Sequence, residues 1–307
     1  MNLPFKNNRF YYLPFLILLP YLIIRLINQS QMLWQFPFDY TNDISCYIAF
    51  LHWLKVYGYH GFVPNWFNGI VLFDVYPPGW AFFAYPLYLL TNNLLYTVYS
   101  LLIIMFLLGG IVIYFLGKTQ NWSFAKITGF YALFFMSPMA IGDFIRQGRQ
   151  PEMLAWLLFI AIIGIIFYFK DKSITWNFLW CTPLYAALVL TRQMETILVS
   201  FIMLGLALTR TKIKEIGIMA ITFGLGLLLS AFWWIPFLQK ASQTNVTLEA
   251  AGSWLLDFTH SFTFGNIILI IMPIVFLVLF YIYWKAKGYA KKELIFFLPL
   301  LLLSIAV

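Results

Sequence analysis

The sequence predicts an all-α protein, a polytopic bundle of transmembrane helices, and three observations support this fold class. The 307 residues are 63% hydrophobic and 10% charged, whereas soluble domains are about 45–50% apolar and about 25% charged. Apolar runs long enough to cross a bilayer recur along the chain. Basic residues lie between these runs and form no patch, so the net charge of +8 indicates membrane topology and not a nucleic-acid partner.

The apolar runs predict about nine spans. They lie at 10–27, 94–116, 124–141, 153–169, 175–191, 196–209, 215–236 and 265–284, and a last run begins near 294 and is still apolar at Val307. We therefore expect residues 1–307 to form one transmembrane module, the N-terminal portion of a longer chain. The first run lacks a small-residue cleavage site, which favours a retained span over a signal peptide.

Lys and Arg in the loops predict the orientation of the spans. With a cytoplasmic N-terminus, the inner loops carry 13 basic and 3 acidic residues, and the outer segments carry 6 basic and 8 acidic residues. This alternation assigns residues 28–93, 142–152 and 237–264 to the outer side, with 28–93 as a long first outer loop.

The first outer loop is predicted to carry a surface helix. Apolar residues at helical spacing indicate an amphipathic helix over 43–57, capped by Thr41 or Asn42. Asp43 lies in its first turn, where the helix dipole favours the ionised carboxylate that a general base requires. A simple capping role for Asp43 is an equally good interpretation.

Aromatic residues are dense in the following stretch, "NWFNGIVLFDVYPPGW" (Asn65–Trp80). Trp66, Tyr76 and Trp80 suit either the aromatic belt of a membrane interface or stacking on sugar faces. Asp74 precedes the Pro-Pro turn. His52 and His60 are eight residues apart, which is not a metal-ligand spacing.

Two further polar segments interrupt the outer ends of spans. "GDFIRQGRQPEM" (Gly142–Met153) holds two arginines three residues apart, which can bracket one phosphate or instead bind lipid headgroups and local acids. In "LTRQMETIL" (Leu190–Leu198), Arg192 and Glu195 either face a cavity or form a local ion pair at i, i+3. The charged residues of the segment Gly142–Met153 are Asp143, Arg146, Arg149 and Glu152.

These features together resemble the GT-C glycosyltransferases, which include oligosaccharyltransferase, protein O-mannosyltransferase and aminoarabinose transferase. The shared layout is a first span, an outer loop with an early Asp, a surface helix, and "W-x-x-G" followed by "YPP". "QPEMLA", "LTRQME" and "AFWWIPFL" match later elements of that layout. The chain is most similar to uncharacterised prokaryotic members, and the resemblance covers most of its length.

The resemblance implies an inverting sugar transfer from a polyprenyl-phosphate-linked donor at the outer face of a prokaryotic plasma membrane, as in cell-envelope glycosylation. It implies Asp43 first and Asp39 second as catalytic acid, Arg146, Arg149 and Arg192 at the donor phosphate, and Asp143 and Glu152 as second-loop acids. Trp66, Tyr76 and Trp80 would contact sugar or acceptor. Some members use a divalent cation, Mg²⁺ or Mn²⁺, but the acids of "DYTND" are four residues apart and the DxD pair is absent.

Two other functions fit the same residues. A transporter or flippase of lipid-linked precursors would share the apolar spans and the phosphate-binding arginines, but would place ionisable residues and broken helices near mid-membrane. A non-catalytic membrane protein of the same fold is the third interpretation. The expected partners are the lipid-linked donor and membrane lipids.

Overall fold

The described part of the chain is mostly helical. The computed structural model describes residues 8–38, 40, 42–66, 68–243, 274–275, 278, 281–282, 285 and 291–306. The only sheet in this part is a two-stranded antiparallel hairpin of β1 (Phe62–Val63) and β2 (Ile70–Val71). The helices are α1 (Leu13–Ser30), α2 (Ile44–Tyr57), α3 (Gly79–Thr91), α4 (Leu94–Thr119), α5 (Phe124–Phe135), α6 (Pro138–Ile141), α7 (Gln150–Phe169), α8 (Cys181–Val189), α9 (Gln193–Leu208), α10 (Ile213–Gln243) and α13 (Lys291–Ala306).

Four helical segments are long and apolar enough to cross a membrane, which confirms the helical membrane protein. They are Arg9–Leu33, Leu94–Thr119, Gln150–Phe169 and Ile213–Lys240. Phe124–Phe135 and Pro138–Arg146 are bent by 45° and make a fifth if they are counted as one span. The predicted spans at 10–27, 94–116, 153–169 and 215–236 therefore correspond to continuous helices.

The predicted spans at 175–191 and 196–209 are shorter in the structure than a bilayer requires. The first is divided into the 3₁₀ helix η5 (Trp176–Trp180) and the nine-residue α8, and α9 has 16 residues. A helix of 16 residues is about 24 Å long, against a hydrocarbon core of about 30 Å. Of the predicted span at 265–284, the structure describes only residues 274–275, 278 and 281–282, and the count of about nine spans stays a prediction.

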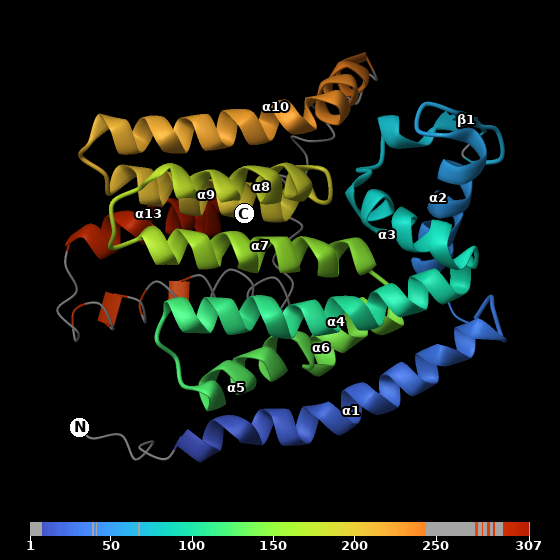
Figure 1. The fold of residues 1–307 in the computed structure, drawn as a ribbon, viewed down its shortest axis with the longest axis horizontal. Helices are drawn as coiled ribbons and strands as arrows, with labels where there is room; N and C mark the ends of the chain where they lie inside the picture. The colour runs from blue at the N-terminus through green and yellow to red at the C-terminus, as the bar shows by residue number, and fades with distance from the viewer. Residues whose placement is uncertain are drawn as a thin grey trace, which may run out of the picture.

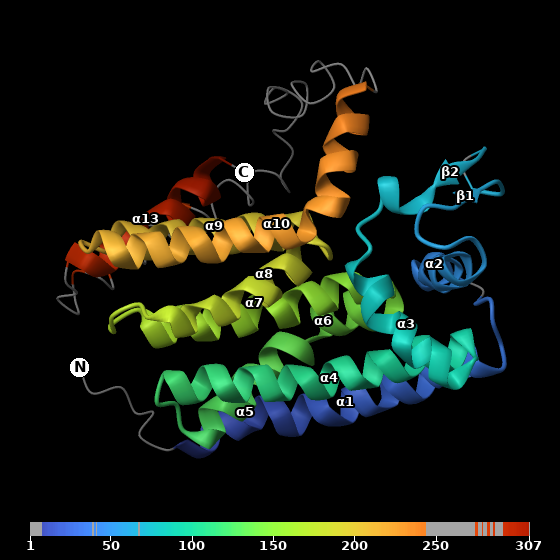
Figure 2. The ribbon, with the colours of Figure 1, turned by 45° about the horizontal axis from the view of Figure 1, so that its top comes forward.

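The long helices lie side by side and run in alternating directions, so their connections gather at two opposite ends (Figures 1 and 2). One end, which we call the pocket end, carries α2, α3, the hairpin, the α6–α7 turn and the α8–α9 junction. Two backbone hydrogen bonds join these segments there, from Asp43 N to Gln147 O at 2.8 Å and from Gly79 N to Leu190 O at 2.7 Å.

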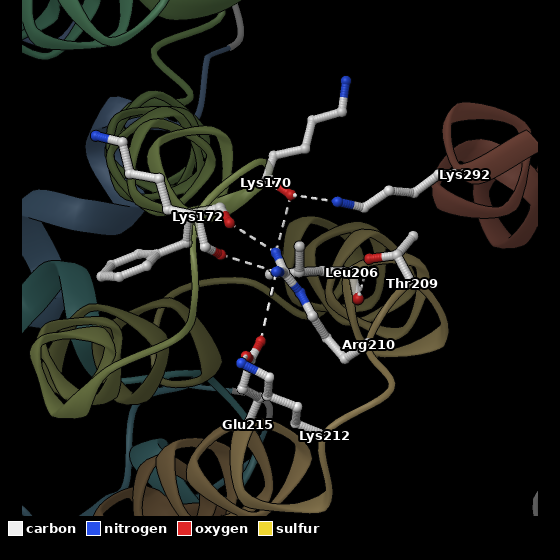
Figure 3. A network of polar contacts seen from close by, with 9 residues as sticks. Lys170, Lys172, Leu206, Thr209, Arg210, Lys212, Glu215 and Lys292 are labelled. Atoms are coloured by element: carbon white, nitrogen blue, oxygen red, sulfur yellow. Dashed lines mark hydrogen bonds and ion pairs between the residues drawn. The ribbon is translucent and has the colours of Figure 1, made fainter. Parts of the chain in front are cut away.

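At the opposite end, Arg210 joins three helices (Figure 3). Its guanidinium donates to the carbonyl oxygens of Phe169 at 2.6 Å, Lys170 at 3.0 Å and Lys172 at 2.8 Å, and lies 3.4 Å from the Glu215 carboxylate. These carbonyls lie at the end of α7, where the last acceptors lack donors within the helix, and a basic side chain adds hydrogen bonds to them. Arg210 therefore fastens the end of α7 to the connection between α9 and α10.

Candidate functional site

A polar cavity of about 280 Å³ opens at the pocket end, between α2, α3, α7 and the α8–α9 junction. We call it the acid–arginine pocket. It is lined by Asp43, Tyr47, Phe50, Tyr76, Pro77, Trp80, Ala81, Arg149, Pro151, Glu152, Thr191, Arg192 and Gln193. Segments far apart in the sequence therefore line one cavity.

Two glycines allow these segments to approach one another. A Cβ at Gly79 would lie 2.4 Å from the Thr191 hydroxyl and 2.7 Å from the Leu190 carbonyl oxygen, so α3 can begin there only with glycine. Gly148 has a φ of +75°, and a Cβ on it would lie 2.2 Å from Ile44 Cγ1. A side chain at either position would push α3 or α2 away from the pocket.

Asp43 does not cap the surface helix. The Asn42 side chain accepts the hydrogen bond from the Ile44 N–H at 3.0 Å, whereas the Asp43 side chain makes no cap bond. The carboxylate of Asp43 is therefore available to the pocket, and Asn42, not Asp43, makes the hydrogen bond at the start of the helix. α2 begins at Ile44, one residue later than the predicted range of 43–57.

Arg149 lies among three carboxylates without being held tightly by any of them. Its guanidinium is 3.9 Å from the side chains of Asp43, Asp143 and Glu152. This distance is too long for a hydrogen bond, so the guanidinium donors stay available to a ligand. The Arg149 side chain is 44% exposed, which gives a ligand access to it.

Arg192 is held far more closely than Arg149. It forms a short ion pair with Glu152 and lies 3.4 Å from the Glu195 carboxylate, which is almost fully buried. Burial lowers the pKa of Arg192, but the hydrogen bond to Glu152 and the negative charges of both glutamates outweigh burial and raise it. The two interpretations of Arg192, a cavity residue and a local ion pair with Glu195, are both correct.

Tyr47 is a pocket residue that the sequence interpretation missed. It lies one helical turn after Asp43, so the i, i+4 spacing could have identified it. Burial, and then the charge of Asp43, raises the pKa of the Tyr47 hydroxyl, which therefore remains a proton donor at neutral pH. Its ring packs against Trp80 with centroids 5.2 Å apart.

The three predicted aromatic contacts separate into two groups. Tyr76 and Trp80 line the pocket, and the buried Trp80 indole N–H has no hydrogen-bond partner among the described residues. Trp66 is not a lining residue and packs against Trp53 with centroids 5.1 Å apart. A free indole N–H next to the pocket is suited to a ligand oxygen.

Several predicted residues lie apart from the pocket. Arg146 is exposed at the end of the π-helical turn Gly142–Arg146 and is not a lining residue, and Asp143 contacts the site through Arg149. Asp74 pairs with Lys240 instead. Asp39 lies outside the described residues.

The residues of the pocket do not form a metal site. Within the described residues, no group of three or more His, Cys, Asp or Glu side chains is arranged to hold a metal ion. The Mg²⁺ or Mn²⁺ ion that the resemblance leaves possible therefore finds no set of three such ligands among these residues, and no chemical step below passes through a metal.

The chain matches the model of one protein family. The family model described as the 6-pyruvoyl-tetrahydropterin synthase related domain, a membrane protein, matches residues 75–264, more than half of the sequence. The chain belongs to this family. The related domain includes Tyr76, Trp80, Arg149, Glu152 and Arg192, and it begins after Asp43. Searches of the curated proteins and of the solved structures found no match.

Proposed function

We propose that the chain is a membrane glycosyltransferase with a GT-C-like arrangement of about nine spans. It moves a sugar from a polyprenyl-phosphate-linked donor to an acceptor, with inversion, in the acid–arginine pocket. The observation that carries the proposal is the open pairing of Arg149 with Asp43 in a cavity that aromatic side chains also line.

Arg149 is the better phosphate ligand of the two pocket arginines. An exposed ion pair contributes about 0–1 kcal/mol, whereas a charge-assisted hydrogen bond contributes about 1.5–3 kcal/mol. A phosphate that makes forked bonds to Arg149 therefore outcompetes carboxylates at 3.9 Å. The short Glu152 pair of Arg192 resists such an exchange, so Arg192 orients Glu152 and supplies positive charge at the back of the pocket.

Asp43 acts as general base in this proposal. It takes the proton of the acceptor hydroxyl while the acceptor oxygen bonds to the anomeric carbon of the sugar. The bond between that carbon and the phosphate oxygen breaks, and the lipid phosphate leaves with the bonding electron pair. Arg149 stabilises the charge that develops on the leaving oxygen, and Tyr47 donates a hydrogen bond within the pocket.

The pocket end faces the outer side of a prokaryotic plasma membrane in this proposal. The opposite end carries Lys170, Lys172, Lys212 and Lys292, as expected for cytoplasmic connections. The donor lipid then lies in the membrane beside the pocket, and the acceptor enters from outside.

A transporter of lipid-linked precursors is the second candidate. The 45° bend between α5 and α6 favours it, because transporters often carry broken helices at their binding sites. However, residues 135–142 around this bend include no ionisable side chain. The charges lie instead at the helix ends, which favours the enzyme.

The phosphate site is tested by donor binding to the purified protein. We expect Arg149→Ala to weaken binding of a polyprenyl-phosphate sugar by about tenfold or more, which corresponds to about 1.4 kcal/mol. Arg146→Ala tests the pairing predicted from the sequence and should have a much smaller effect, because Arg146 lies outside the pocket. Lys55→Ala, at the pocket end, is the control for loss of a positive charge. Equal binding by Arg149→Ala and the unchanged protein would contradict the assignment.

A further inference from the structure

An apolar groove runs along α4, α7 and α8, away from the acid–arginine pocket. It consists of two cavities, of about 410 Å³ nearer the pocket and about 1040 Å³ farther along the helices. Val112, Ala161 and Leu184 line both cavities, so the two are parts of one groove. Its walls are almost entirely hydrocarbon, with Thr119 and Asn177 among the few polar side chains at the far end.

The groove adjoins the acid–arginine pocket at the contact between α3 and the end of α8. Thr191 lines both the pocket and the nearer cavity, next to Arg192. Gly79 lines the nearer cavity, and Trp80 and Ala81 line the pocket, so the first turn of α3 forms part of both. The groove therefore lies beside the pocket, where it is within reach of the apolar part of a molecule whose charged head is at Arg149.

The groove is longer than one leaflet of a bilayer. Its lining along α7 extends from Leu154 to Phe169, fifteen residues later, which is about 22 Å at 1.5 Å per residue. The hydrocarbon core is about 30 Å thick, so one leaflet provides about 15 Å. Ala161 lies about 10 Å from Leu154 along the helix, and the section beyond it crosses the midplane of a bilayer.

We infer that this groove binds the hydrocarbon tail of the lipid whose phosphate occupies Arg149, and that the groove selects tails longer than one leaflet. The inference rests on the proposed function for its head group. The two arginines at one end favour an anionic head group. The apolar wall and its length past the midplane favour a long hydrocarbon chain. An ordinary phospholipid with its head in the pocket leaves the section beyond Ala161 unfilled.

Two positions allow the groove to be blocked at different depths. Ala161 lies where the two cavities meet, so Ala161→Trp closes the far cavity. Gly164 lines the far cavity one turn farther along α7, and a Cβ there meets Leu116 only at ordinary contact distances of 3.8 Å or more, so Gly164→Leu narrows the far cavity. Gly224 on α10 has no atom within 4 Å of its Cβ position and lines neither cavity, so Gly224→Trp and Gly224→Leu are matched controls.

The experiment compares binding of undecaprenyl phosphate, a long tail, with binding of farnesyl phosphate, a short tail, to protein in nanodiscs. The tail moves from the lipid bilayer to an apolar groove, so the gain in binding free energy comes from packing and is modest. We expect the unchanged protein to bind the long tail about tenfold more tightly than the short one. Ala161→Trp should remove the preference for the long tail and keep farnesyl phosphate binding. Gly164→Leu should reduce the preference for the long tail. Both Gly224 variants should keep it.

The outcomes separate the groove from the head-group site. If Ala161→Trp and Gly164→Leu both keep the preference for the long tail, the groove holds only bulk membrane lipid and the inference is overturned. Arg149→Ala should weaken binding of both phosphates by the same factor. If it weakens neither while Ala161→Trp still removes the length preference, the proposed phosphate site fails and the tail groove stands.

Discussion

The side chains of Asp43 and Arg149 lie 3.9 Å apart in the pocket, and no described neighbour holds either of them by a hydrogen bond. This arrangement follows from small local features. The Asn42 side chain accepts the hydrogen bond from the Ile44 N–H at the start of α2, so the Asp43 carboxylate is not needed there. Gly148 turns the chain, and Arg149 is the residue immediately before α7. A reactive pair that is free to bind a ligand therefore depends on neighbours that provide the structural bonds.

The ionised state of Asp43 can be measured through its neighbour Cys46. Burial, and then the charge of Asp43, raises the pKa of the Cys46 thiol to about 11, so the thiol is protonated and reacts slowly near pH 8. Asp43→Asn removes the negative charge, which lowers this pKa and increases the thiolate fraction. We expect alkylation of Cys46 by iodoacetamide at pH 8 to become about two- to tenfold faster, a change of up to one pKa unit.

Asp74→Asn is the control for this measurement, because Asp74 pairs with Lys240 outside the pocket. An alkylation rate that is unchanged in Asp43→Asn would mean that Asp43 carries no charge near Cys46. That result would remove the general base from the proposed mechanism.

Among the helices, Arg210 and its partners, which we call the Arg210 clamp, join α7 to α10 at the end opposite the pocket (Figure 3). The side chains of Arg210 and Glu215 are 7% and 10% exposed, so removing Arg210 leaves the Glu215 carboxylate buried with only the exposed Lys212, 4.0 Å away, as a partner. The clamp fixes the relative position of α7 and α10. Since α7 also begins at the pocket, the clamp supports the site from a distance.

We therefore expect Arg210→Ala to lower the free energy of unfolding by on the order of 3 kcal/mol. The buried Glu215 carboxylate loses its nearest partner, and the carbonyl groups of Phe169, Lys170 and Lys172 each lose one hydrogen bond. The measurement is thermal unfolding of the purified protein in detergent. Lys212→Ala is the matched control, because Lys212 lies 4.0 Å from the same Glu215 with a side chain that is 72% exposed. Such an exposed pair should contribute less than about 1 kcal/mol. Similar losses in the two variants would show that the clamp has no special role.

The long spans could be predicted from the sequence because each depends only on a local property, an apolar run. The runs at 94–116 and 153–169 correspond to α4 and α7 for this reason. The region 175–209 was harder to predict. The polar break after Thr191 agrees with the predicted end of a span at 191, but the span at 175–191 is divided into the 3₁₀ helix η5 and the short α8, which its apolar run does not indicate.

The site was predicted less completely than the spans. Arg146 and Arg149 were paired by their spacing, but the π-helical turn ends at Arg146 and Gly148, with φ of +75°, reverses the chain before Arg149. The Glu152–Arg192 pair joins residues forty positions apart and depends on the packing of α7 against α9. No local pattern in one sequence contains that information.

For the chain as a whole, the alternating helices predict that every connection at one end of the bundle shares one side of the membrane (Figures 1 and 2). We expect a cysteine at Asn68, in the hairpin at the pocket end, to react with an impermeant thiol reagent in intact cells. A cysteine at Lys172, at the opposite end, should react only after the membrane is opened. The reverse pattern would place the pocket in the cytoplasm and contradict the proposed outer-face site.

The most direct test is sugar transfer from a radiolabelled polyprenyl-phosphate sugar in membranes that contain the unchanged protein or Asp43→Asn. Asparagine keeps the size of the side chain and leaves the Asn42 cap in place, but it cannot accept a proton. We expect transfer by the unchanged protein, and a loss of about 10²–10⁴-fold in Asp43→Asn at equal membrane abundance. Asp74→Asn should keep its activity. Transfer by Asp43→Asn at the rate of the unchanged protein, or no transfer by the unchanged protein with any lipid-linked sugar offered, would contradict the glycosyltransferase proposal.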